Sequence, residues 1–273
     1  MSIEIDKDSL SDIVTDGTPD NYKVIGLGKI GCGIADQFKQ YPEYKVFRVS
    51  SDLSVKNSLY VQPEKNIEEY EKNFDEVEAD LFCKRFKKGD SIIFVLQGGD
   101  PITGITLSFL EKIKHTKIMV IYVKPDADVV SVIQKRDDRI VYNVLQEYTR
   151  SGLLEKMLII ERSRVEDMIG DVPVSQYEKS IYHFISYIPA MINYFENAGS
   201  ILETKLQPPN VCRIGTYGLA SLDKNIDIKF LFPVENEKSA HFYFGIPDEM
   251  LATDNKLMQK IKSQVKRFSK DEV

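Results

Sequence analysis

The chain contains a glycine-rich turn whose residue types could bind phosphate. The turn reads GKIGCG, follows the short apolar run KVIGL at 23–27, and leads into residues with helical spacing from Ile34 to Gln40. The apolar run predicts a buried strand, and the residues after the glycines predict a helix. Glycines let the chain bend sharply and let a ligand approach the backbone, because they have no Cβ. The N–H groups and the dipole at a helix start favour negative charge. The turn therefore predicts a nucleotide-binding loop.

A second glycine-rich turn follows another apolar run. The run reads SIIFVL at 91–96, and the turn after it reads QGGDPITG, with a helix predicted to start near Thr103. The run lacks polar alternation, which indicates a strand buried on both faces. Ligands of parallel sheets bind at the carboxyl ends of the strands, so we expect both turns at the same edge.

Further strands and helices alternate along the first two thirds of the chain. Apolar runs predict strands at 44–49, 117–123 and 156–160, one or two amphipathic helices within 64–88, and a helix at 137–150. This alternation predicts an α/β fold with a Rossmann-like parallel sheet covered by helices on both sides. The expected carboxyl ends of the strands carry glycine, hydroxyl and charged residues.

The pattern changes after Gly170. A long apolar helix is predicted at 175–199, where Pro189 should kink or break it. Three short strands, VCRIGTY, IDIKFLF and SAHFYFG, have links too short for helical crossovers, so they predict a small antiparallel sheet. A final helix is predicted at 248–268, with lysines that we interpret as a solvated face.

Composition and charge exclude several classes of protein. The 273 residues are 42% hydrophobic and 29% charged, with a net charge of −6, which argues against a nucleic-acid coat and against binding an anionic membrane. The three cysteines, Cys32, Cys83 and Cys212, are far apart, so we expect reduced thiols, no metal site and a cytoplasmic protein. The polar N-terminus is no signal peptide, and no apolar run approaches the ~20 residues of a membrane helix.

The first turn by itself also fits a dinucleotide-binding domain. Residues 26–31, GLGKIG, match GxGxxG, and Asp52 follows the second predicted strand, where such folds keep a ribose-binding acid. An NAD-binding Rossmann domain is therefore one interpretation, although no residues suited to hydride transfer stand out.

The second turn favours a different family. Seven residues separate Phe94-Val95 from Thr103-Gly104, a spacing that resembles the signature of the tubulin and FtsZ superfamily. The first turn is similar to the tubulin loop GQCGNQI, and Val123-Lys124-Pro125 resembles the VTKP segment of FtsZ. The predicted helix at 175–199 matches the central helix of that family. The resemblance covers roughly residues 23–199, and the small phage and plasmid members are nearest in size.

The resemblance implies a tubulin/FtsZ-like organisation. It comprises a mobile N-terminal arm at 1–21, a GTPase-like nucleotide-binding domain at 22–174, the central connecting helix at 175–199, and a reduced α+β C-terminal domain at 200–273. It also implies a site for GTP or GDP, with Mg²⁺ accompanying the nucleotide. The first turn would touch the α and β phosphates, and the second would wrap the β and γ phosphates.

The implied nucleotide-binding residues come from five segments of the chain. They are Gly28, Lys29, Gly31, Cys32, Asp52, Gly98, Gly99, Thr103, Gly104, Arg162 and Tyr182. Asp52 would lie near the ribose or base, and Tyr182, or less readily Tyr177, would stack on guanine. The alternatives are that Asp52 caps a turn and that Tyr182 is a core aromatic. Arg162 stands where the family has an asparagine.

Two departures from the family weaken this site. Asp100, Pro101 and Ile102 stand where the family has glycines; an aspartate repels a γ-phosphate, and proline removes an N–H donor. The segment after the central helix lacks the family's aspartates, and Glu203 is its nearest carboxylate. Phosphoryl transfer needs a group that orients water, so we expect at most weak GTPase activity and assign no catalytic residue.

These observations predict a filament-related, cytoskeletal protein with a degenerate guanine-nucleotide site. Its partner would be a second copy or a related filament protein, with no direct contact to nucleic acid or membrane. The alternatives are an interaction protein of the same fold that binds no nucleotide, and the NAD-binding domain.

Overall fold

A parallel β-sheet forms the centre of the molecule. The computed structural model describes residues 20–52, 57–197, 212–221, 228–235 and 239–268. Within this part of the chain the main sheet has seven strands in the order β3-β2-β1-β4-β5-β6-β7, and every pair of neighbours is parallel. The strands are β1 (Tyr22–Leu27), β2 (Tyr44–Ser50), β3 (Ser58–Tyr60), β4 (Ser91–Gln97), β5 (Lys117–Lys124), β6 (Lys156–Glu161) and β7 (Ile214–Gly215). The predicted α/β fold is confirmed.

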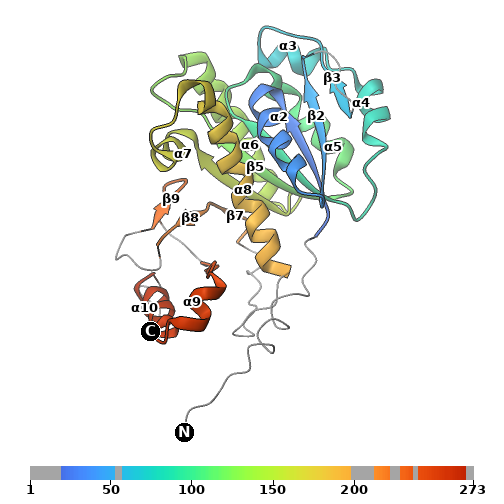
Figure 1. Cartoon of the computed structure of the whole chain (residues 1–273). Coiled ribbons are helices and arrows are strands. Elements are labelled where there is room, and N and C mark those ends of the chain that lie inside the picture. Colours follow the sequence, from blue (N-terminus) through green and yellow to red (C-terminus); the bar gives the residue numbers. More distant parts are fainter. Residues whose placement is uncertain (1–19, 53–56, 198–211, 222–227, 236–238, 269–273) are drawn as a thin grey trace.

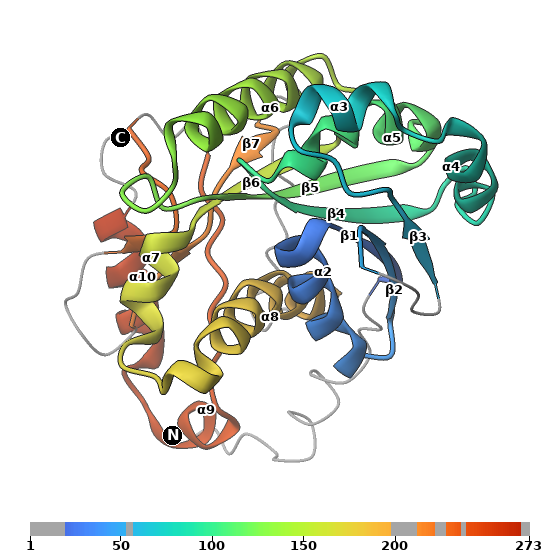
Figure 2. The ribbon, with the colours of Figure 1, turned by 90° about the horizontal axis from the view of Figure 1, so that it is seen from above.

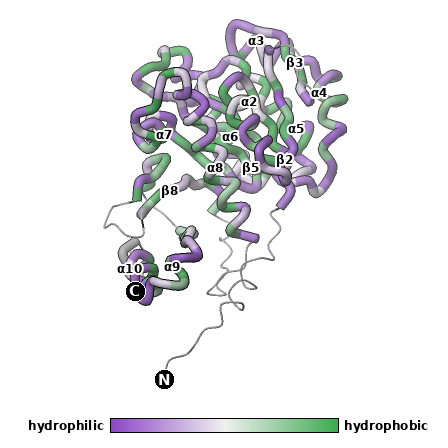
Figure 3. The backbone as a smooth tube through the Cα atoms, in the orientation of Figure 1, coloured by the Kyte–Doolittle hydropathy of each residue, from purple (hydrophilic) through white to green (hydrophobic). Residues whose placement is uncertain are grey.

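Helices cover both faces of this sheet (Figure 2). They are α2 (Gly28–Gln37), α3 (Ile67–Lys72), α4 (Glu76–Cys83), α5 (Thr106–Ile113), α6 (Val132–Arg150), α7 (Arg162–Ile169) and α8 (Tyr177–Asn197). One apolar cluster lies between the sheet and the helices α3 to α6, and a second lies between the sheet and α2, α7 and α8. Because the central strands are buried on both faces, they are continuous apolar runs, and Figure 3 shows this hydrophobic interior.

The helix after the first glycine turn starts earlier than the sequence predicts. It begins at Gly28, directly after β1, and passes at Gln37 into a short 3₁₀ turn, Phe38–Gln40. The predicted start at Ile34 is wrong because tertiary packing overrides the low helix propensity of the three glycines. Gly31 shows this packing, since a Cβ there would lie 2.4 Å from the carbonyl oxygen of Val95 on β4.

The long helix α8 crosses the face of the sheet that α2 also covers (Figures 1 and 2). It runs unbroken through Pro189, so the alternative of a break at this proline is wrong. Its apolar side chains Ile181, Ile185 and Ile188 are buried in the cluster shared with α2. The spacing of these residues puts them on one side of a helix.

The segment after α8 differs most from its prediction. Strand β7 does not join a separate antiparallel sheet but pairs in parallel with β6. A small antiparallel sheet is present in the described residues, formed by β8 (Gly218–Leu219) and β9 (Lys229–Phe230). The described residues 239–245 contain no strand, so the third predicted strand is wrong.

The predicted C-terminal helix is two helices, α9 (Asp248–Thr253) and α10 (Leu257–Phe268). Asp254 separates them, and its Oδ1 accepts a hydrogen bond from the N–H of Lys256 at 2.9 Å. Asp254 is the C-cap of α9, and this side-chain bond forms a turn that ends α9 before α10 begins at Leu257. Most of the expected N-terminal arm, and the segment holding Glu203, lie outside the described residues. Among the helices that are described, none has the length and apolar character needed to cross a membrane.

Candidate functional site

The two glycine turns meet at the carboxyl edge of the sheet. Strands β1 and β4 are neighbours, with Gly26 paired to Val95, and each strand leads directly into its turn. A Cβ built on Gly28 would lie 2.6 Å from Oδ2 of Asp100 and 2.9 Å from Cγ2 of Ile102. The first turn is therefore in direct contact with the second, as the sequence predicts for one shared site.

The carboxylate of Asp100 lies at this contact. Its Oδ1 accepts a hydrogen bond from the N–H of Ile102 at 3.3 Å, at the start of the 3₁₀ turn Pro101–Ile105. Burial raises the pKa of the Asp100 carboxyl above its usual range. Removing a carboxylate from water disfavours its charged form, and one weak N–H donor compensates only part of that cost.

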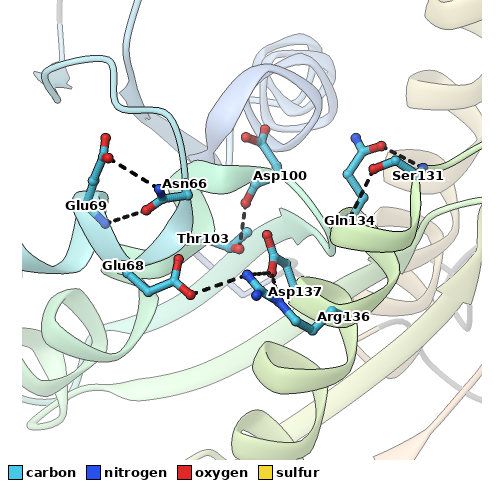
Figure 4. A network of polar contacts seen from close by, with 9 residues as sticks. All are labelled: Asn66, Glu68, Glu69, Asp100, Thr103, Ser131, Gln134, Arg136 and Asp137. Atoms are coloured by element: carbon cyan, nitrogen blue, oxygen red, sulfur yellow. Dashed lines mark hydrogen bonds and ion pairs between the residues drawn. The ribbon is translucent and has the colours of Figure 1, made fainter.

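Hydrogen bonds of Thr103 close the second turn. The hydroxyl and the backbone N–H of Thr103 both donate to the carbonyl of Asp100, at 2.6 and 2.9 Å, and Thr103 is only 2% exposed (Figure 4). Gly99 has a φ of 76°, in the region that favours glycine. Gly104 lies against α3, where a Cβ would meet the carbonyl oxygen of Ile67 at 2.1 Å. The side chain of Thr103 thus holds the turn together and does not point to an open site.

A polar cluster packs directly against Gly98 and leaves no room for a side chain there. A Cβ on Gly98 would lie 2.0 Å from Oδ1 of Asp138 and 2.2 Å from the hydroxyl oxygen of Tyr122. Tyr122 donates its hydroxyl to Asp138 at 2.7 Å, and Lys124 pairs with the same carboxylate at 3.0 Å. This cluster explains the glycine by protein packing alone, and it puts a second carboxylate beside the turn.

In the first turn, Gly31 and Cys32 face the protein interior. Gly31 contacts β4, as described above, and Cys32 is fully buried. The thiol of Cys32 donates to the carbonyl of Gly26 at 3.1 Å, and burial raises its pKa. Only backbone atoms of these residues could reach a ligand.

Arg162 and Tyr182 lie together where α7, α8 and α2 meet. Arg162 pairs with Glu166 at 3.0 Å and with Glu178 at 2.5 Å. A Cβ on Gly33 would lie 2.5 Å from the ring of Tyr182. Burial, and to a smaller extent a hydrogen bond with Glu178, raises the pKa of the Tyr182 hydroxyl. The guanidinium is therefore held by two carboxylates, and the tyrosine ring packs on α2.

Lys29 and Asp52 are the exposed members of the predicted set. Burial opposes ionisation of Glu178, but hydrogen bonds from Arg162 and Tyr182 and the charge of Lys29 lower its pKa overall. Lys29 thus lies near the Arg162 group. The N–H of Asp52 donates to the Ser50 hydroxyl at 3.1 Å, in the turn that follows β2.

Solved structures with the same architecture identify the fold. No protein-family model matches the sequence, and no curated protein does. The chain matches TubZ of Clostridium botulinum phage c-st with 14% identity and a TM-score of 0.50, over 66% of this chain and 63% of that one. It matches FtsZ of M. jannaschii with 13% identity and a TM-score of 0.53, over 72% and 60%. It matches TubZ of Bacillus thuringiensis serovar israelensis, solved as GDP-form protofilaments, with 11% identity and a TM-score of 0.50, over 77% and 65%.

The chain has the fold of the tubulin and FtsZ superfamily. The fold that the sequence motifs predict is thereby confirmed. The matched regions span less than two thirds of each of these solved tubulin-like chains, at 63%, 60% and 65%.

A polar network beside the second turn of this tubulin-like fold was missed from the sequence. Arg136 pairs with Asp137 at 2.9 Å and with Glu68 at 3.3 Å, which links α6 to α3 (Figure 4). Its only sequence signal is the Ser131-x-x-Gln134 capping box that starts α6. The network borders an open groove of about 450 Å³ lined by Asn66, Glu68, Glu69, Lys72, Ile133 and Arg136. In the part of the chain that the structure describes, no three acidic, histidine or cysteine side chains form a group that could hold a metal ion.

Proposed function

We infer that the chain is a filament-related, cytoskeletal protein with a degenerate guanine-nucleotide site, and that it associates with a second copy of itself or with a related filament protein. Its tubulin/FtsZ-like fold supports this proposal, because TubZ of the same fold was solved as protofilaments. In this organisation residues 22–174 form the nucleotide-binding domain, 175–199 the connecting helix and 200–273 the reduced C-terminal domain, in a cytoplasmic protein.

The observation that carries the degenerate site is the contact between Asp100 and Gly28. A phosphate of GTP or GDP bound at the first turn would lie beside the carboxylate of Asp100. Oδ2 of this carboxylate is so close to Gly28 that a Cβ built on the glycine would lie 2.6 Å from it. Two negative groups that lie close together repel each other, most strongly where water is excluded. Pro101 adds no N–H to the turn. Any nucleotide, with its Mg²⁺, therefore binds weakly.

The other predicted site residues do not supply the phosphate donors that the second turn lacks. The hydroxyl and the backbone N–H of Thr103, the predicted phosphate donor, both donate to the carbonyl of Asp100. Arg162 is paired with Glu166 and Glu178. Phosphoryl transfer depends on charge stabilisation at the phosphates and on an oriented water. We therefore expect at most weak GTPase activity.

Electron microscopy and sedimentation of the purified full chain, with and without GTP, test the proposal. We expect filaments or sedimenting oligomers, either of the chain alone or after addition of a related filament protein, and equal amounts with and without GTP. A monomer that stays in the supernatant under every one of these conditions contradicts the filament-related function. Calorimetric titration with NAD tests the dinucleotide-binding alternative, for which micromolar binding is the supporting result.

A further inference from the structure

We propose that the basic outer face of α10 binds the acidic N-terminal segment, residues 1–19, of the same chain. The contact involves neither glycine turn, so it goes beyond the proposed function and does not depend on it. Three observations support the contact: the side chains that α10 leaves exposed, the opposite charges of the two segments, and the place where residue 20 is held.

Helix α10 has a buried apolar side and an exposed basic side. Leu257 and Ile261 are 6% and 8% exposed, so they face the rest of the chain. Met258, Lys262 and Lys266 are exposed, and their spacing of four residues places them together on the opposite side of the helix. The outer face of α10 therefore presents one apolar side chain and two positive charges.

The sequence of the helix contains no carboxylate that could offset these charges. Residues 255–268 include four lysines and one arginine but no aspartate or glutamate. Asp254, just before them, pairs with Lys260 at 2.7 Å, which leaves Lys262 and Lys266 on the exposed face. Like charges four residues apart on a helix repel each other, so an acidic segment bound across this face stabilises it.

The N-terminal segment has the opposite charge. Its carboxylates are Glu4, Asp6, Asp8, Asp12 and Asp16, and Lys7 is its one basic side chain. Isoleucine, leucine and valine stand between these acids in the sequence. Such apolar side chains suit the methionine and the aliphatic stems of the lysines on α10. Residues 1–19 thus match the outer face of α10 in both charge and apolar content.

The structure fixes the point where this segment joins the folded part of the chain. The N–H of Asp20 donates to Oδ1 of Asn193 at 3.1 Å, and Nδ2 of Asn193 donates to the carbonyl of Asp20 at 3.0 Å. The same Nδ2 also donates to the hydroxyl of Tyr44 at 2.9 Å, and Asn193 is 5% exposed. Residue 20 is therefore held near the C-terminal end of α8.

The part of the chain that leads to α10 contacts the same end of α8. Tyr243 donates its hydroxyl to Glu196 at 2.8 Å, and a Cβ on Gly245 would lie 3.3 Å from the ring of Phe195. Helix α9 begins soon afterwards, at Asp248, and α10 follows it. Figure 1 shows α8 running toward the side of the molecule that carries α9 and α10.

The N-terminal segment is long enough to reach α10 of its own chain. Nineteen residues can span roughly 60 Å at full extension, whereas the 12 residues of α10 form a helix about 18 Å long. A segment tethered this close has an effective concentration in the millimolar range, above that of a second copy in dilute solution. The contact is therefore expected within one chain.

Carbodiimide coupling of the full-length chain tests the proposal, because it joins a carboxylate directly to a lysine amine. We expect crosslinks from residues 1–19 to Lys262 and Lys266 to be at least about tenfold more abundant than crosslinks to Lys45. Lys45 is the matched control, since it is exposed and is paired with Lys23, three residues from Asp20. In a mixture of ¹⁴N- and ¹⁵N-labelled chains, both crosslinked peptides should carry the same label.

Hydrogen exchange of residues 1–19 in the full-length chain provides a second measurement. The variant with Lys262→Glu and Lys266→Glu should exchange at least about threefold faster in this segment than the wild type, and Lys45→Glu should exchange like the wild type. Raising the salt concentration from about 50 mM to about 500 mM should remove the protection from the wild type, because salt screens exposed charges. This salt comparison needs no variant and decides alone if the double variant does not fold.

Three results would overturn the proposal. The first is equal crosslinking to Lys45, Lys262 and Lys266, which would mean that the segment does not prefer α10. The second is an exchange rate in residues 1–19 that neither salt nor the double variant changes. The third is a predominance of crosslinks between differently labelled chains, which would assign the acidic segment to a second copy. None of these results depends on whether the chain forms filaments.

Discussion

The ring of Tyr182 on α8 lies against Gly33 on α2, so closely that a Cβ on this glycine would be 2.5 Å from the ring. The glycine lets α8 pack onto the helix that follows the first turn. Packing of α8 on α2 therefore explains why position 33 is a glycine, without any role in ligand binding.

Gly33→Ala should lower the free energy of unfolding by about 1–3 kcal/mol, the usual effect of overpacking a filled interior. Urea unfolding of the full chain measures this change. Gly215→Ala is the control, because a Cβ there meets nothing within 4 Å, and it should stay within about 0.5 kcal/mol of the wild type. If Tyr182→Ala is introduced together with Gly33→Ala, the cost of the alanine should shrink; purely additive effects would show that the two residues are not in contact.

Gly28 and Asp100 should be energetically coupled. Gly28→Ala meets both an unfavourable φ of 73° and the Asp100 carboxylate, whereas in an Asp100→Ser background only the backbone strain and the contact with Ile102 remain. We expect a coupling free energy of about 0.5–3 kcal/mol in a double-mutant cycle read by urea unfolding. A coupling indistinguishable from zero would place the carboxylate away from the first turn.

The raised pKa of Asp100 predicts a pH dependence of stability. Because burial raises the folded-state pKa of Asp100 above the usual range of an aspartate, the folded chain holds this proton more tightly than the unfolded chain. The contribution of Asp100 to stability is therefore largest below the unfolded-state pKa and is lost as the pH rises through the folded-state pKa. The difference in unfolding free energy between wild type and Asp100→Asn should fall with rising pH over this acidic range, and a difference that rises would contradict the partly buried position of Asp100.

Much of the fold could be predicted because its signals are local. Continuous apolar runs mark β1, β4, β5 and β6, and the glycine turns after β1 and β4 mark the shared edge. The parallel pairing of β7 with β6 could not be predicted, because Ile214 and Gly215 form only a short strand whose partner is set by tertiary packing. The two-residue strands β8 and β9 have the same limitation.

The sequence predicts which residues would form the candidate site but not the contacts that they make. The sequence indicates that Asp100 would repel a phosphate, but only the structure shows its Oδ2 against Gly28. The sequence also cannot show that Thr103 bonds to the carbonyl of Asp100, or that Arg162 pairs with Glu178. Each of these pairings depends on side-chain conformations that a motif does not encode.

The guanine-nucleotide content of the purified protein tests the central claim most directly, because it asks whether the two turns, with Asp100 beside Gly28, still bind a nucleotide. The wild-type chain is denatured, and the released nucleotide is separated by anion-exchange chromatography and quantified per chain. We predict essentially no GTP or GDP. Close to one guanine nucleotide per wild-type chain would contradict the account.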